Sequence, residues 1–167
     1  MLKHPSASIR IAAITITTRG VSFAILEGSS LLDWGTLSFG APSQRSAINR
    51  MVERLDLYQP TNIVIENVWA LKRRGKRSCS IASSLLRVIR TRNTPLVFLT
   101  PDDAKSTLDR LSPPVITKAD MATRLLNYFP HLKNVAPQKR KTWMGEDHRM
   151  PIFAAIALAL CALDRFT

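Results

Sequence analysis

The sequence predicts an α/β domain with a mixed five-stranded sheet, three antiparallel strands and then parallel strands, flanked by helices. Up to Phe39 the chain holds three short apolar or β-branched runs separated by turn residues. Beyond that point helical and strand patterns alternate, an order typical of parallel strands joined by right-handed crossovers. At 167 residues the chain can build one hydrophobic core, so we expect a single domain over residues 1–167.

The three opening strands are predicted from their composition and from the turns between them. Residues Arg10–Thr17 are apolar and β-branched, and Gly20 ends this run. Val21–Leu26 alternates weakly, Glu27–Ser30 contains a turn, and Leu31–Phe39 forms the third run. Connections this short join antiparallel neighbours, so the segment predicts an antiparallel meander.

Helices and strands alternate in the rest of the chain. Apolar residues recur at helical spacing after Ser43, which is a suitable N-cap, and Pro60 ends this helix. Ile63–Ile65 is apolar throughout, as in a strand with parallel neighbours. The segments that follow are a helix at 78–91, a strand at 96–99, short helices at 102–108 and 118–128, a loop at 130–145 and an apolar helix at 147–163.

An excess of positive charge is the clearest functional signal of the composition. Twenty-four Lys and Arg residues against 12 Asp and Glu give a net charge of +12. Such an excess attracts polyanions, among which nucleic acid is the commonest partner of a globular protein. A membrane surface or an acidic protein is the alternative. The charge gathers in predicted loops rather than along an amphipathic helix, which favours nucleic acid.

The sequence predicts neither a membrane-spanning segment nor a disulfide framework. The last apolar run has about a dozen residues, which is too short to span a bilayer. The two cysteines, Cys79 and Cys161, lie in helical patterns without a Cys-x-x-Cys motif. We therefore expect a cytoplasmic protein with reduced thiols and no membrane partner.

Two basic segments, each with a tryptophan beside it, are the candidate nucleic-acid contacts. The first follows Trp69 and the second precedes Trp143. Their basic residues are Lys72, Arg73, Arg74, Lys76 and Arg77 in the first segment, and Lys139, Arg140 and Lys141 in the second. Arginine can bind phosphate oxygens in a bidentate manner. A run of charge is also common on a surface that is merely solvated, and this alternative stays open.

A single acid, Glu66, ends the buried strand at 63–65 and lies just before the first basic segment. A carboxylate there suits a metal ion held beside a phosphate backbone. The same side chain is able to cap a helix or to pair with an arginine of the loop. Asp102 and Asp103 indicate only a helix N-terminus, where acids are favoured by the helix dipole.

Four segments together carry a resemblance to a known family: 13–25, 63–67, 118–130 and 146–157. Their order, with an acid ending the fourth strand and a helix closing the chain, resembles the ribonuclease H-like superfamily and, within it, the RuvC-type Holliday junction resolvases. The resemblance implies a ribonuclease H-like fold and a homodimer that binds branched or structured DNA. It also implies phosphodiester hydrolysis by two Mg²⁺ or Mn²⁺ ions held by carboxylates.

The resemblance further implies which residues form the catalytic site, and the sequence departs from the family at two positions. Thr15 stands where the family has an Asp in the first strand, and Ala154 stands where it often has an Asp on the last helix. Glu66 and Asp147 remain as catalytic residues and metal ligands, with Glu146 adjacent. Because Asp147 precedes Ala154 by about two helical turns, we expect them to share a helix face. Asp147 is alternatively the N-cap of that helix.

Three functional hypotheses follow. The first is a DNA-binding protein whose cleavage activity is low or absent because carboxylates are missing. The second is a working endonuclease that uses Glu66, Asp147, Glu146 and Thr15 around fewer metal ions. The third is a non-enzymatic adaptor that binds nucleic acid or a protein partner. The cofactor is Mg²⁺ or Mn²⁺ if the chain is active, and the alternative is that no metal is bound.

Overall fold

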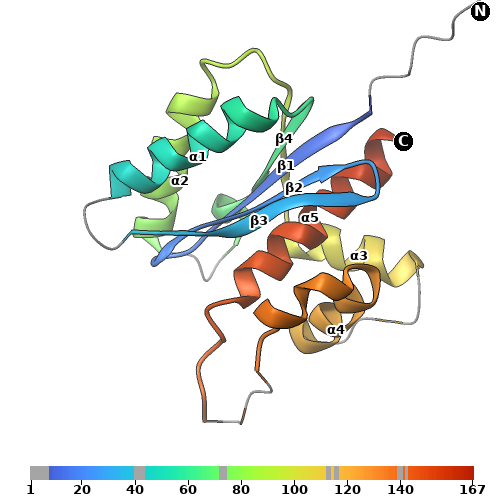
Figure 1. Ribbon diagram of the computed structural model, residues 1–167. Coiled ribbons are helices and arrows are strands. Elements are labelled where there is room, and N and C mark those ends of the chain that lie inside the picture. Colours follow the sequence, from blue (N-terminus) through green and yellow to red (C-terminus); the bar gives the residue numbers. More distant parts are fainter. Residues whose placement is uncertain are drawn as a thin grey trace, which may run out of the picture.

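A five-stranded sheet with the strand order β3-β2-β1-β4-β5 forms the centre of the protein (Figure 1). The computed structural model describes residues 8–39, 44–71, 75–111, 114, 117–138, 141 and 143–167. The strands are β1 (Arg10–Ile16), β2 (Gly20–Glu27), β3 (Ser30–Ser38), β4 (Asn62–Glu66) and β5 (Leu96–Leu99). The first three form an antiparallel meander, and β4 and β5 continue the sheet parallel to β1. The predicted mixed sheet is therefore confirmed.

Helices lie on both sides of this sheet (Figure 1). One face is covered by α1 (Gln44–Tyr58) and α2 (Lys76–Ile89). On the other side are α3 (Pro101–Leu111), α4 (Lys118–Tyr128) and α5 (Met150–Phe166). Two short 3₁₀ helices, η1 (Val68–Ala70) and η2 (Pro130–Val135), lie between β4 and α2 and after α4.

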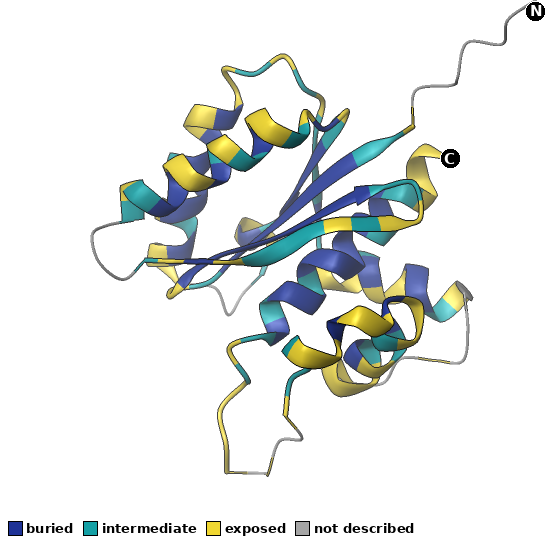
Figure 2. Ribbon diagram, in the orientation of Figure 1, coloured by how far each residue is buried: buried dark blue, intermediate teal, exposed yellow. Residues whose placement is uncertain are grey.

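Alternation of side chains along β1 produces two separate cores. Ile11 and Ala13 belong to the core beneath α5, whereas Ala12, Ile14 and Ile16 belong to the core beneath α1 and α2. Successive side chains of a strand point to opposite faces, so a strand between two helical layers must be apolar on both. Figure 2 shows β1 buried along nearly its whole length between these layers.

The start of the last helix and the structure of the segment before it differ from the prediction. The last helix begins at Met150 rather than Asp147, and Pro151 occupies its first turn. Proline is tolerated there because the first amide hydrogens of a helix have no intrahelical acceptor. The segment Pro130–Val135, predicted as loop, forms η2 and also begins with a proline. Ser43, the predicted N-cap of α1, lies outside the described residues.

Cys79 and Cys161 are both free thiols. Within the described part of the chain, no helix combines the length and the apolar character needed to cross a bilayer.

Candidate functional site

Thr15 and Glu66 lie side by side near the ends of β1 and β4. The parallel register that pairs Ile14 with Ile65 brings the two residues that follow to the same level. Both are buried, with 2% of each residue exposed. The backbone N–H of Ile16 donates a hydrogen bond to Glu66 Oε2 over 3.4 Å. A carboxylate is thus fixed in the interior at the edge of the sheet.

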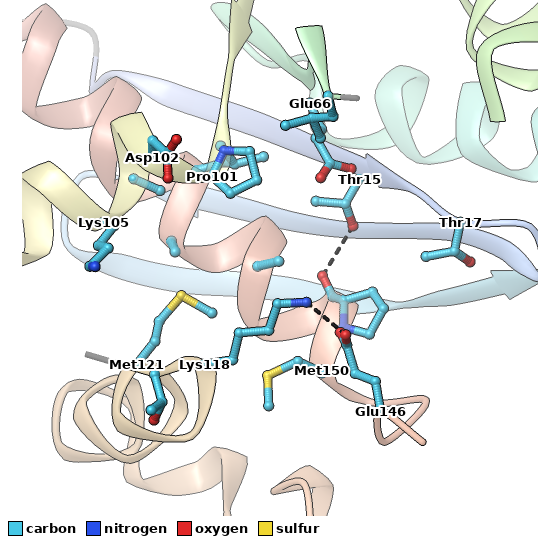
Figure 3. Close-up of a pocket in the computed structure, with 17 residues that line it drawn as sticks. Thr15, Thr17, Glu66, Pro101, Asp102, Lys105, Lys118, Met121, Glu146 and Met150 are labelled. Carbon is cyan, nitrogen blue, oxygen red and sulfur yellow. Dashed lines mark hydrogen bonds and ion pairs between the residues drawn. The ribbon is translucent and has the colours of Figure 1, made fainter. Parts of the chain in front are cut away.

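These two side chains line a cavity of about 520 Å³ between the sheet and helices α3, α4 and α5 (Figure 3). Ala154 lines it from α5, and Glu146 from the segment before α5. The structure therefore brings four of the predicted site residues to one cavity. Most of the remaining wall is apolar and includes Leu71, Pro101, Met121, Met150, Pro151 and Leu158.

The hydroxyl of Thr15 ties β1 to the first turn of α5. It lies 3.0 Å from the carbonyl oxygen of Pro151 and 3.5 Å from that of Ser22. A carbonyl oxygen only accepts, so the hydroxyl must be the donor. An aspartate at this position would instead place its carboxylate against the Pro151 oxygen. Thr15, which stands where an acid was expected, thus makes a hydrogen bond that joins β1 to α5.

Asp147 lies before α5, and Arg149 holds its carboxylate. The Nε and Nη2 atoms of Arg149 donate to it over 3.0 and 2.9 Å. The backbone N–H groups of Arg149 and Gln138 each donate over 2.9 Å. Because the helix begins at Met150, the expectation that Asp147 shares a helix face with Ala154 is wrong. Asp147 is not among the residues that line the cavity, and the N-cap of α5 is Arg149.

These contacts also set the charge state of the Asp147–Arg149 pair. Hydrogen bonds from the Arg149 side chain, aided by the backbone N–H groups of Arg149 and Gln138, hold the pKa of Asp147 well below its usual range. The same side-chain hydrogen bonds raise the pKa of Arg149. Asp147 is therefore a charged acceptor that organises the segment leading into α5.

Replacing Asp147 with alanine is expected to lower the free energy of unfolding by about 1–3 kcal/mol at neutral pH, because the Arg149 groups lose a charged acceptor. Since the folded-state pKa of Asp147 is lowered, this stabilisation is present above the unfolded-state pKa of about 4 and is lost as the pH falls below it. Urea unfolding at neutral and acidic pH measures the difference between the variant and the native chain, which should shrink in acid.

The matched control is Asp164→Ala, which removes an exposed ion pair with Arg110. Exposed pairs contribute about 1 kcal/mol or less, so its effect should be small. Equal losses in the two variants would contradict a structural role for Asp147.

Three charged residues of the cavity were not predicted. Lys118, at the start of α4, donates to Glu146 Oε2 over 2.6 Å (Figure 3). Lys105 and Asp102 reach the cavity from the first half of α3. The sequence showed Asp102 only as part of a helix start. Their position results from the packing of α3 and α4 near α5, and hydrophobic periodicity gives no helix-packing geometry.

The donors at this site do not match what two Mg²⁺ or Mn²⁺ ions require. Magnesium takes octahedral oxygen coordination, with carboxylates supplying the protein's ligands. Among the described residues, no three His, Cys, Asp or Glu side chains gather closely enough to hold an ion. The ammonium group of Lys118 pairs with Glu146, and the guanidinium group of Arg149 pairs with Asp147. Glu66 beside a neutral hydroxyl is a poor ligand set for a pair of dications.

The two basic segments are partly described. Lys76 and Arg77 are exposed in the first turn of α2. Lys141 is exposed, and its Nζ lies 5.7 Å from the centre of the Trp143 ring, which is itself 77% exposed. The predicted contact residues that lie outside the described part of the chain are Lys72, Arg73, Arg74, Lys139 and Arg140.

Comparison with known proteins gives matches in structure alone. No protein-family model and no curated protein matches the sequence. Thermus thermophilus RuvC in complex with a Holliday junction substrate is similar over 95% of both chains, with a TM-score of 0.67 and 15% identity. The yeast mitochondrial Holliday junction resolvase matches over 96% of this chain and 80% of that one, with a TM-score of 0.61 and 14% identity.

A third solved structure is similar over almost its whole length. Fowlpox virus resolvase, in a complex with Holliday junction DNA, matches over 93% of this chain and 99% of that one, with a TM-score of 0.53 and 14% identity. At sequence identities this low, the structural similarity establishes the fold and leaves the activity open. The chain has the ribonuclease H-like fold of the RuvC-type Holliday junction resolvases.

Proposed function

We propose that the protein binds branched or structured DNA and that its metal-dependent cleavage is impaired by missing carboxylates. The observation that carries this proposal is the Thr15 hydroxyl, which bonds to Pro151 O over 3.0 Å at the position of the expected first-strand acid. The net charge of +12 attracts a polyanion such as DNA. Two of the structural neighbours were solved with Holliday junction DNA, which supports DNA as the partner.

Exposed cations and an aromatic ring lie close in the sequence to residues that line the cavity. Leu71 lines the cavity, and α2 begins shortly after it with the exposed Lys76 and Arg77. Trp69, 45% exposed, lies just before Leu71 and offers a surface on which an unpaired base can stack. Further along the chain, Lys141 precedes Glu146, which lines the cavity. A strand crossing the cavity would therefore meet positive charge from both basic segments.

The homodimer implied by the resemblance fits this proposal and stays a prediction. Two copies related by a two-fold axis would match the two-fold symmetry of a four-way junction.

Replacing both Lys76 and Arg77 with glutamine is expected to weaken binding to four-way junction DNA. Each phosphate contact contributes about 0.9 to the slope of log K against log salt concentration, so the slope should decrease by about 2. Fluorescence anisotropy over a range of salt concentrations measures it. The matched control is Arg110→Gln with Arg165→Gln, which removes the same charge from the last turns of α3 and α5.

The outcomes of this experiment separate the hypotheses. An equal decrease in the control would reject the proposed contact surface. No junction binding at low salt would reject the proposed function. Junction cleavage with Mg²⁺ or Mn²⁺ that disappears in Glu66→Ala would establish the alternative, an active endonuclease.

A further inference from the structure

The segment that leads into α5 is a loop whose two ends are joined. The backbone N–H of Gln138 donates to the carboxylate of Asp147 over 2.9 Å, and Arg149 holds the same carboxylate. Lys118 donates to Glu146 over 2.6 Å and ties this end of the loop to α4. The described parts of the loop extend away from the helices beside it (Figure 1). Closed surface loops of roughly 6–16 residues frequently carry function.

Lys141 and Trp143 form a pair within this loop. The backbone N–H of Met144 donates to the carbonyl oxygen of Lys141 over 3.0 Å and closes a tight turn that contains Trp143. The Nζ atom of Lys141 lies over the Trp143 ring, 5.7 Å from its centre, which is a cation–π contact. Single exposed apolar side chains are common on protein surfaces. Trp143 is distinguished by its exposed fraction of 77% together with the cation that the turn places over its ring.

Trp143 lies close to the cavity of the candidate site. It precedes Glu146 by three residues, which limits the distance between their Cα atoms to about 11 Å. Glu146 lines the cavity, so the Trp143 ring is within reach of a DNA strand that passes there. Trp69 is less available for stacking, because it is 45% exposed and its ring meets that of Phe98 edge-on, with the centres 5.8 Å apart.

We propose that Trp143 stacks on an unpaired base of the bound DNA while Lys141 binds a phosphate oxygen of the same strand. The inference rests on the proposed DNA-binding function and names the part of the DNA that this loop takes. Aromatic rings combined with cations hold single-stranded nucleotides in many proteins, and they accept any base because every base has a π face. The lysine ammonium has three donors, so it can bind phosphate while it stays over the ring.

A membrane surface is the other partner that an exposed tryptophan beside cations suits. Helices that bind in a membrane interface present a continuous apolar face to the lipid. Between Lys141 and Arg149 the described residues form no helix, so the loop offers one ring in a turn rather than such a face. One flat ring with one cation matches a single nucleotide, which has one base and one phosphate.

Two DNA duplexes that differ in one base test the inference. One carries a single unpaired adenine, and the other carries an abasic analogue at the same place, which keeps the backbone charge. The native chain should bind the adenine duplex about tenfold more tightly, since base–aromatic stacking contributes about that factor. Trp143→Ala should remove the difference and Trp143→Phe should keep most of it. Lys141→Gln should weaken both duplexes alike and decrease the salt slope by about 0.9.

Phe166→Ala is the matched control, because it removes another exposed aromatic ring from the chain. Phe166 ends α5, and Met150 begins it, so the two lie about 24 Å apart along the helix. This variant should keep the difference between the duplexes. Trp143 is largely exposed, so its variants should fold like the native chain, which circular dichroism checks. Stacking quenches tryptophan emission, so the adenine duplex should quench the native chain more than Trp143→Phe.

The outcomes separate the inference from the function on which it rests. Equal affinity of the native chain for the two duplexes would overturn the inference and leave junction binding intact. A difference that persists in Trp143→Ala, or that disappears in Trp69→Ala alone, would also overturn it. Binding to phosphatidylserine vesicles that depends on Trp143, without a difference between the duplexes, would assign the ring to a membrane. Loss of all DNA binding at low salt would instead overturn the proposed function.

Discussion

Thr15→Asp is expected to lower the free energy of unfolding by about 3–5 kcal/mol, the usual effect of an uncompensated buried charge. The new carboxylate would lie beside Glu66 and against the carbonyl oxygen of Pro151, to which the threonine hydroxyl donates over 3.0 Å. Burial and a neighbouring acid raise the pKa of such a carboxyl. Because the folded-state pKa then exceeds the unfolded-state value of about 4, the loss of stability is small in acid and grows as the pH rises.

Urea unfolding over a range of pH values measures this effect. Thr15→Val is the matched control, because it keeps the shape of the side chain and removes only the hydroxyl. It should lower the free energy of unfolding by about 1 kcal/mol, without pH dependence. A Thr15→Asp protein as stable as the native chain at neutral pH would show that this position accommodates a charge, and it would reopen the case for a metal site.

Phe153→Ala is expected to lower the free energy of unfolding by about 3–5 kcal/mol, the range found when a large buried aromatic side chain is truncated. Phe153 is 0% exposed and packs in the core between α5 and the sheet. Chemical denaturation monitored by circular dichroism measures the loss. Phe166→Ala, in the last turn of the same helix, is the matched control. Phe166 is 38% exposed, so its replacement should have a much smaller effect, and equal losses would contradict the described burial of α5.

The elements with clear apolar patterns were predicted closely from the sequence. The bounds of β5 (Leu96–Leu99) and α4 (Lys118–Tyr128) agree with the prediction. The start of α5 was placed too early, because Asp147 has the chemistry of an N-cap. Its carboxylate instead binds the side chain of Arg149, and Pro151 was the better indication of the first helical turn.

The candidate site was predictable to the extent that it depends on strand order. Once β1 and β4 are parallel neighbours in the register that pairs Ile14 with Ile65, Thr15 lies beside Glu66. Lys105 and Lys118 could not be placed, because α3 and α4 reach the cavity through helix packing, and the crossing angles of helices are not encoded in hydrophobic periodicity. The catalytic and metal-binding roles assigned by resemblance stay predictions.

The unequal burial of Thr15 and Ala154 makes the two positions differ in how well they would tolerate an acid. Ala154 is half-buried at the cavity wall, so an aspartate there would keep contact with water. Thr15 is 2% exposed, and its hydroxyl holds α5 to the sheet. A carboxylate at position 15 would lose its hydration and the bond between β1 and α5, whereas one at position 154 would stay hydrated. A designed negative charge is therefore better placed on the helix than on the strand.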